Sequence, residues 1–153
     1  MNASPDNRKR VILMADDDED DRLLTAEALK RCGLEGEISF FADGAELMDF
    51  LRGDTRGAPA VGGRPEIILL DINMPKKNGW DVLDELKSDS RLSPIPVILM
   101  TTSSSEQDVV RSYRMGASSF ITKPRHFQDL VRVVGEIGEY WFKTVRLPDH
   151  VHG

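Results

Sequence analysis

The sequence predicts an α/β fold in which a parallel sheet of five strands is flanked by five helices. Short apolar runs alternate with segments of helical spacing five times along the 153 residues, and the strongest runs each stop at a polar or acidic residue. Such alternation is typical of a parallel sheet that is covered by helices on both faces. The length suits one domain that buries an adequate core.

Five segments have the composition of strands. Three are continuous apolar runs, rich in valine and isoleucine, which suit strands buried on both faces. Two others are more polar and give a weaker signal. The three strong runs are Val11–Ala15, Ile67–Leu70 and Val97–Met100, and the two weaker ones are Glu37–Phe41 and Ser119–Thr122.

Five further segments carry apolar residues at helical spacing, and two of them end at a glycine, Gly33 or Gly116, that suits a helix C-terminus. We interpret Arg52–Pro65, which is rich in glycine, as an exposed loop within the domain, because the alternation continues beyond it. The five stripes are Leu24, Ala28 and Cys32; Leu47, Phe50 and Leu51; Val82, Leu83 and Leu86; Val109, Val110 and Tyr113; and Leu130, Val134, Ile137 and Trp141.

Composition and charge disfavour several classes of protein. A net charge of -6 argues against a nucleic-acid partner, because affinity for phosphate backbones rests on lysine and arginine. No apolar run approaches the ~20 residues of a membrane span, and the polar start of the chain does not resemble a secretory signal. Cys32 is the single cysteine of the sequence, which excludes an internal disulfide, and we interpret it as an apolar filler. We expect a soluble, cytoplasmic protein.

Polar side chains follow the predicted strands at the point where each strand ends. Asp16 and Asp17 follow the first strand, Asp71 the third, Thr101 the fourth and Lys123 the fifth. In an open parallel sheet, ligands bind beyond the carboxyl ends of the strands. These side chains are therefore expected to converge on one site at that edge of the sheet.

The three carboxylates of this set indicate a metal ion. Brought together, they would repel one another strongly unless a cation neutralised them, and hard oxygen ligands favour Mg²⁺. We expect Asp17 and Asp71 to bind the ion directly and Asp16 to hold a metal-bound water. The backbone carbonyl of Asn73 is a candidate for a further ligand.

Asp71 is the candidate nucleophile, because a carboxylate can attack phosphorus and form an acyl phosphate. Stabilising a transferred phosphoryl group is chiefly a matter of positioning and charge. Lys123 would add a positive charge to that of the metal, and the Thr101 hydroxyl would donate to a phosphoryl oxygen. Taken alone, Lys123 is more typical of a surface lysine and Thr101 of a strand-end cap.

Local alternatives remain for several of these residues. The unbroken acidic run Asp16–Asp21 would also suit a solvated loop, and we expect its last members, Asp20 and Asp21, to cap the first helix and to complement its dipole. A cis bond before Pro124 would turn the preceding lysine toward the pocket, but the sequence leaves the isomer open. Gly79, in the loop after the third strand, is expected to tolerate a positive φ.

Four motifs stand at predicted strand ends, in the order MADDDEDD, LLDINMPKKNGWDVL, PVILMTTS and GASSFITKP. Together they resemble the CheY-like receiver domains of two-component response regulators. The resemblance implies a flavodoxin-like sheet of strand order 2-1-3-4-5 and a phosphoryl group transferred from a sensor histidine kinase to Asp71. It also implies a Mg²⁺ site and a phosphate-sensing switch. Its further residues are Asp16, Asp17 and Asn73 for the metal, Thr101 and Lys123 for the phosphoryl group, and Phe120 for the switch.

The resemblance divides the chain into a flexible N-terminus (1–8), a receiver domain (9–142) and a C-terminal tail (143–153), with no output domain expected. The Thr-Thr-Ser after the fourth strand, the glycine-rich loop and the YWF…LP ending resemble small regulators paired with bacterial and cyanobacterial phytochrome kinases. In that subtype the fifth helix and the tail would form a homodimer. A second apolar stripe on that helix fits either a dimer or burial under the tail; it consists of Val133, Ile137 and Tyr140.

We expect a phosphoacceptor signalling protein that is not an enzyme, and three other functions are alternatives. An aspartyl phosphohydrolase would want a second acid two residues after Asp71, where this chain has Asn73. A receiver that serves only for docking would have no need of the complete set of functional residues. A phosphate sink, or a relay that passes the group to a histidine phosphotransfer protein, remains open from the sequence.

Overall fold

The computed structural model of the chain describes residues 11–34, 37–53, 65–102 and 105–147. The N-terminus expected to be flexible (1–8), most of the glycine-rich loop and the end of the tail (148–153) lie outside the described residues.

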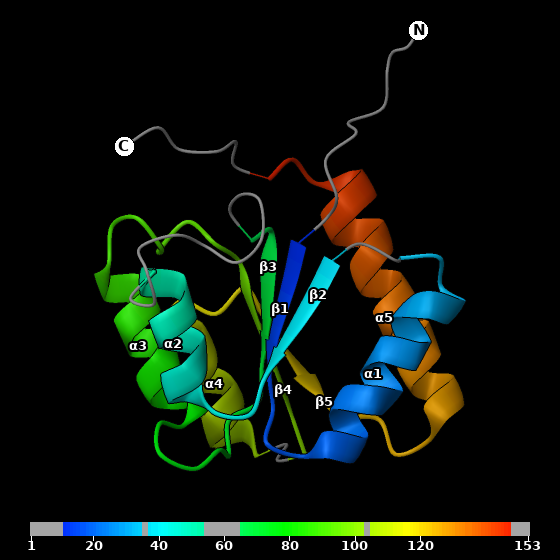
Figure 1. The fold of residues 1–153 in the computed structure, drawn as a ribbon, viewed down its shortest axis with the longest axis horizontal. Helices are drawn as coiled ribbons and strands as arrows, with labels where there is room; N and C mark the ends of the chain where they lie inside the picture. Colours follow the sequence, from blue (N-terminus) through cyan, green and yellow to red (C-terminus); the bar gives the residue numbers. More distant parts are fainter. Residues whose placement is uncertain (1–10, 35–36, 54–64, 103–104, 148–153) are drawn as a thin grey trace, which may run out of the picture.

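Strands and helices alternate along the whole described chain (Figure 1). The elements are β1 (Val11–Ala15), α1 (Glu19–Arg31), β2 (Glu37–Phe41), α2 (Gly44–Arg52), β3 (Ile67–Leu70), α3 (Gly79–Ser88), β4 (Val97–Thr101), α4 (Glu106–Arg114), β5 (Ser119–Thr122), α5 (Phe127–Glu139) and a π-helical turn, η1 (Tyr140–Thr144).

The five strands form one parallel sheet in the order β2-β1-β3-β4-β5, which confirms the predicted fold class and strand order. Figure 1 shows α1 and α5 on one face of the sheet and α2, α3 and α4 on the other. Because β1 and β3 are neighbours at the centre, the loops that follow them lie side by side. This arrangement places the chemistry at the carboxyl edge of the sheet.

Side chains of the central strands alternate between two apolar layers, as the pleat of a strand requires. Leu13 and Leu70 pack with α2 and α3 on one face, whereas Ile12 and Leu69 pack with α1 and α5 on the other. All four are almost fully buried. The prediction that β1, β3 and β4 are buried on both faces is therefore confirmed.

Two of the predicted helix stripes are wrong in part. Leu24 is 45% exposed, and the buried face of α1 is formed by Thr25, Ala28 and Leu29 instead. On α4, Val110 and Tyr113 are exposed while a polar residue, Ser112, is buried. α4 lies against β5, the edge strand of the sheet, so the part of its surface that the core covers is narrow.

The last predicted helix divides into two parts. α5 ends at Glu139, and the chain then widens into η1, where the Val145 N–H donates to the Tyr140 carbonyl over 2.9 Å. The Thr144 hydroxyl donates to the Glu139 carbonyl and closes the turn. Trp141, expected as the end of the apolar stripe, packs against the core of the α1–α5 face. Among the described residues, no helix is long and apolar enough to cross a membrane.

Candidate functional site

The centre of the sheet delivers two carboxylates to one point. Ala15 and Leu70 are register partners at the ends of β1 and β3, so Asp16 and Asp71 follow them side by side. The Asp71 N–H donates to the Ala15 carbonyl over 3.0 Å, and the Asp16 N–H donates to the Phe41 carbonyl at the same distance. These main-chain bonds extend the sheet by one residue and fix where both side chains start.

Carboxylate oxygens of Asp16, Asp17 and Asp71 all lie within 4.8 Å of one another. We name these three residues the acidic triad. Asp16 and Asp71 are buried, while Asp17 is exposed at the rim. A cluster of oxygen donors at this spacing, with two members buried and one exposed, fits a divalent cation that keeps some of its waters.

Lys123 reaches the triad from the end of β5. Its ammonium Nζ donates to a carboxylate oxygen of Asp16 over 2.6 Å, of Asp21 over 2.7 Å and of Asp71 over 3.3 Å. The Lys123 N–H also donates to the Thr101 carbonyl over 2.8 Å, which extends the pairing of β4 with β5 past the last strand residue. The lysine predicted from the strand end is therefore held against the carboxylates.

Burial and charge act against each other in this group. Burial raises the pKa of Asp16 and of Asp71, and hydrogen bonds and the charge of Lys123 offset only part of that rise. Burial alone would lower the pKa of the Lys123 ammonium, but its bonds to Asp16 and Asp21 raise it above the ordinary lysine value. The lysine therefore carries its charge at neutral pH, and the two buried acids ionise less readily than exposed ones.

The acidic run after β1 caps helix α1 and connects the start of that helix to the site. Asp18, and not the later acids, caps α1 by accepting the N–H groups of Asp20 and Asp21. The prediction that Asp20 and Asp21 are the caps is therefore wrong, because the N-cap is Asp18, the residue before the helix starts at Glu19. Both acids do lie in the first turn of α1, where they complement the helix dipole as expected. Arg22 donates to the Asp16 carbonyl over 2.7 Å, which ties the start of the helix to the site.

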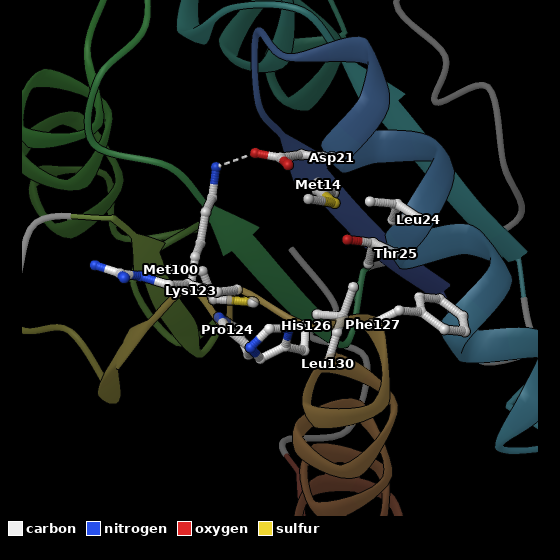
Figure 2. A pocket seen from close by; sticks show the side chains of 11 residues that line it. Met14, Asp21, Leu24, Thr25, Met100, Lys123, Pro124, His126, Phe127 and Leu130 are labelled. Atoms are coloured by element: carbon white, nitrogen blue, oxygen red, sulfur yellow. Dashed lines mark hydrogen bonds and ion pairs between the residues drawn. The ribbon is translucent and has the colours of Figure 1, made fainter.

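The contact of Asp21 with Lys123 is a feature of the site that the sequence does not predict. The Asp21 carboxylate points out of the first turn of α1 toward Lys123, as Figure 2 shows. The position of Asp21, five residues after Asp16 and in the first turn of α1, could have indicated this contact. The same position is equally typical of an acid that only complements the helix dipole.

The loop from β3 to α3 holds Asp71 in place by close backbone contact. A Cβ on Gly79 would lie 2.5 Å from the Asp71 carbonyl oxygen, so glycine is required there for proximity. The predicted positive φ of Gly79 is wrong; within the described part of this loop it falls on Lys76, at 65°. Asn73 has an exposed side chain two residues after Asp71.

The proposed switch residues occupy different depths. Thr101 is fully buried at the end of β4, whereas Phe120 on β5 is partly buried and packs against the core under α2 and α3. The Phe120 N–H donates to the hydroxyl of Tyr113 on α4 over 3.3 Å. The hydroxyl of Tyr113, on α4, therefore lies next to the backbone of Phe120.

Beside the acidic triad, a small pocket of about 50 Å³ opens between α1 and the start of α5 (Figure 2). Lys123 and Asp21 border it, and Met14 and Met100 from the sheet contribute to its apolar walls. Thr25 of α1 also lines it and is 2% exposed. The sequence does not predict this pocket, because its walls come from four separate stretches of the chain.

A family model described as the response regulator receiver domain matches residues 12–135 of the chain. The response regulator Rcp1 of Synechocystis is 40% identical over 144 residues, which cover 93% of this chain and 95% of that protein. The family model therefore covers most of the chain, and the similarity to Rcp1 covers nearly all of it.

Solved structures of response regulators are also similar to this chain. The Mn²⁺-bound form of response regulator Rcp1 superposes with a TM-score of 0.81 at 39% identity, covering 92% of this chain and 99% of the other. The phosphorylated cyanobacterial phytochrome response regulator RcpA superposes with a TM-score of 0.85 at 38% identity, again covering 92% and 99%.

Proposed function

The chain belongs to the response regulator receiver domain family, and we propose that it accepts a phosphoryl group on Asp71 from a histidine kinase, with Mg²⁺ bound beside it. It is thus a response regulator of two-component signalling. The main support for this proposal is the position of Asp71. It is buried at the end of a strand, belongs to the acidic triad and lies 3.3 Å from the Lys123 ammonium.

The transfer needs little covalent chemistry from the protein. An oxygen of the Asp71 carboxylate forms a bond to phosphorus while the bond from phosphorus to the donor's histidine nitrogen breaks and leaves the imidazole. Lys123 faces the developing charge on the phosphoryl oxygens, and its raised pKa keeps it protonated at neutral pH. The Thr101 hydroxyl is proposed to donate to one of those oxygens after transfer.

The donor set favours a hard divalent cation. We propose that Asp17 and Asp71 would ligate Mg²⁺ directly, with Asp16 holding a metal-bound water and the Asn73 carbonyl as a further ligand. When bound, the ion supplies positive charge to the phosphoryl oxygens. The buried acids of the triad support this proposal, because the single charge of Lys123 is shared between them and burial makes the remaining negative charge costly.

A signalling role without turnover of a separate substrate suits the site. Asn73, two residues after Asp71, cannot act as a general acid for a phosphohydrolase. We propose that phosphorylation and its loss by hydrolysis are the only reactions that the chain catalyses. The receiver would then act by changing its contacts with other proteins, in the cytoplasm where a kinase meets it.

A phytochrome-type kinase is the proposed donor. The support comes from the relatives, since RcpA is described as a cyanobacterial phytochrome response regulator and a further match, RtBRR, as a bacteriophytochrome response regulator. RtBRR is 36% identical and superposes with a TM-score of 0.73. A histidine phosphotransfer protein remains a second candidate partner, which would make this chain a relay.

We further propose that α5 and the tail (143–153), which follows the receiver domain (9–142), form a homodimer. Tyr140 is 51% exposed at the end of α5 and meets Trp141 edge to face, with 5.1 Å between ring centroids. Val133 is partly buried and Ile137 buried within the α1–α5 core, so the part of the predicted second stripe that is available to a partner is its end.

The test is transfer from a phytochrome-type histidine kinase that has been phosphorylated on its histidine. Wild type and Asp71→Asn are incubated with this kinase and Mg²⁺, and intact mass spectrometry follows the added phosphoryl group. We expect transfer to the wild type and none to Asp71→Asn, since the amide cannot serve as the nucleophile.

Two results would contradict parts of the proposal. Equal transfer to both proteins would place the acceptor elsewhere. No transfer from the kinase, but labelling by acetyl phosphate, would mean that the partner assignment is wrong while the acceptor chemistry stands.

A further inference from the structure

Every N–H of the Lys123 ammonium already has a carboxylate partner. An ammonium has three donors, and here they meet Asp16, Asp21 and Asp71 at 2.6, 2.7 and 3.3 Å. The longest of the three bonds is the one to Asp71. A phosphoryl group on Asp71 would need the same donors, so it would compete with the carboxylates that hold them.

Asp21 differs from the other two partners. It comes from α1, lies outside the acidic triad and meets Lys123 from the side of the neighbouring pocket (Figure 2). A cation and a phosphoryl group would engage Asp16 and Asp71, whereas Asp21 lies outside that cluster and its contact with the ammonium would stay in place. Its side chain is 35% exposed and that of Lys123 is 12% exposed, so solvent screens this ion pair only in part.

We propose that Asp21 is a positioning residue that restrains Lys123 and thereby opposes occupation of the site by a phosphoryl group; this inference rests on the proposed function. Asp21 acts through Lys123 by retaining one donor, and it adds a negative charge close to where an anion must bind. The same charge favours a cation. Asp21 therefore sets the balance between metal and phosphoryl group at the site.

The test uses beryllofluoride, BeF₃⁻, which coordinates a carboxylate oxygen and mimics a phosphoryl group without covalent transfer. Fluorine NMR of the full chain gives the bound fraction of beryllofluoride in a titration at saturating Mg²⁺. Calorimetry gives the half-saturating concentration of Mg²⁺ with no beryllofluoride present, so that the two affinities are measured independently. The variant is Asp21→Asn, which keeps the shape and removes the charge. The matched control is Asp20→Asn, because Asp20 is the exposed neighbour and is not among the partners of Lys123 in the described structure.

We expect Asp21→Asn to lower the half-saturating concentration of beryllofluoride by about two- to five-fold, the range of a partly exposed ion pair. The half-saturating concentration of Mg²⁺ should rise by about two-fold. Asp20→Asn should change neither by as much. The opposite signs matter, since a loss of structure in the site would weaken both ligands together.

Unchanged or weakened beryllofluoride binding in Asp21→Asn would overturn the inference, as would an equal effect in Asp20→Asn. Failure of the proposed function looks different. If the wild type forms no bound beryllofluoride, or if Asp71→Asn binds it equally well, the acceptor assignment falls and the inference falls with it. If the wild type binds and Asp71→Asn does not, an unaltered Asp21→Asn contradicts the inference alone.

Discussion

Two buried carboxylates, Asp16 and Asp71, meet at the carboxyl edge of the sheet, and burial raises the pKa of both. An acid whose pKa is raised in the folded state stabilises the fold while it is protonated. That contribution is complete below the unfolded value, near 3.8, and is lost as the pH rises through the higher folded value. The site is thus kept at the expense of stability at neutral pH.

Asp71→Asn is accordingly expected to stabilise the metal-free protein at pH 7, by about 0.5–2 kcal/mol, the common range for removing such a conflict. Lys123 loses one partner in the variant but keeps Asp16 and Asp21. Urea unfolding with a chelator present, at several pH values, provides the measurement. The gain should shrink toward pH 3, where both proteins carry an uncharged group, and a variant less stable than wild type at pH 7 would contradict this reading.

The residues of the site differ in how far the sequence could place them. Asp16, Asp71 and Lys123 were placed together from strand ends alone, because parallel strands end at one edge. The sequence predicts Asp21 as a helix cap, whereas its carboxylate contacts Lys123; the direction of a side chain out of a helix depends on which residue starts that helix. Gly79 was assigned a positive φ, yet its role is close contact with the Asp71 carbonyl, which only the folded backbone reveals.

At the scale of elements, α1 and α5 pack together on one face of the sheet. The thiol of Cys32 donates to the Val131 carbonyl over 3.2 Å. Two glycines of α5 lie close to the end of α1 and the residues after it. A Cβ on Gly135 would meet the Cys32 sulfur at 3.4 Å, an ordinary contact distance. A Cβ on Gly138 would lie 2.3 Å from a Leu34 methyl carbon, so the Leu34 side chain would have to shift to admit it.

The two glycines therefore predict opposite effects of the same substitution. Gly135→Ala should stabilise the protein by about 0.5–1 kcal/mol, because alanine is the better residue in a helix interior. Gly138→Ala should destabilise it by about 1–3 kcal/mol through overpacking. Thermal or urea unfolding compares the two variants, and the same sign for both would show that the packing of α1 on α5 is misjudged.

The elements themselves were predictable where their signal was strong. The ends of β1, β2, β3 and β5 agree with the apolar runs, and β4 is one residue longer because Thr101 still pairs with Thr122. The exposed faces of helices were less predictable. Val110 and Tyr113 continue an apolar stripe on α4, but that helix lies at the sheet edge, where there is too little core to cover them.

At the scale of the whole molecule, the site and the proposed dimer surface lie at opposite ends. Figure 1 shows the carboxyl ends of the strands at the bottom of the view, whereas α5 ends and η1 begins at the top. A partner copy bound at η1 would therefore leave the acidic triad open to a kinase. Dimerisation and phosphotransfer are expected to proceed without blocking each other.

The dimer is tested by sedimentation of the full chain over a range of concentrations. We expect Tyr140→Glu to weaken self-association at least about ten-fold, as for an aromatic residue at the centre of an interface. Leu23→Glu is the control, because Leu23 is an equally prominent apolar residue, 62% exposed, on α1. A monomeric wild type, or equal effects of both substitutions, would contradict the proposed interface.

Acceptance of a phosphoryl group by Asp71 is the central claim, and acetyl phosphate with Mg²⁺ tests it without any partner protein. Wild type, Asp71→Asn and Asp43→Asn are compared by intact mass spectrometry. Asp43 is also a buried acid that follows a strand, but it caps α2 and lies outside the triad. The account predicts one added phosphoryl group on wild type and Asp43→Asn, lost when a chelator removes the metal, and none on Asp71→Asn. Equal labelling of Asp71→Asn would contradict it.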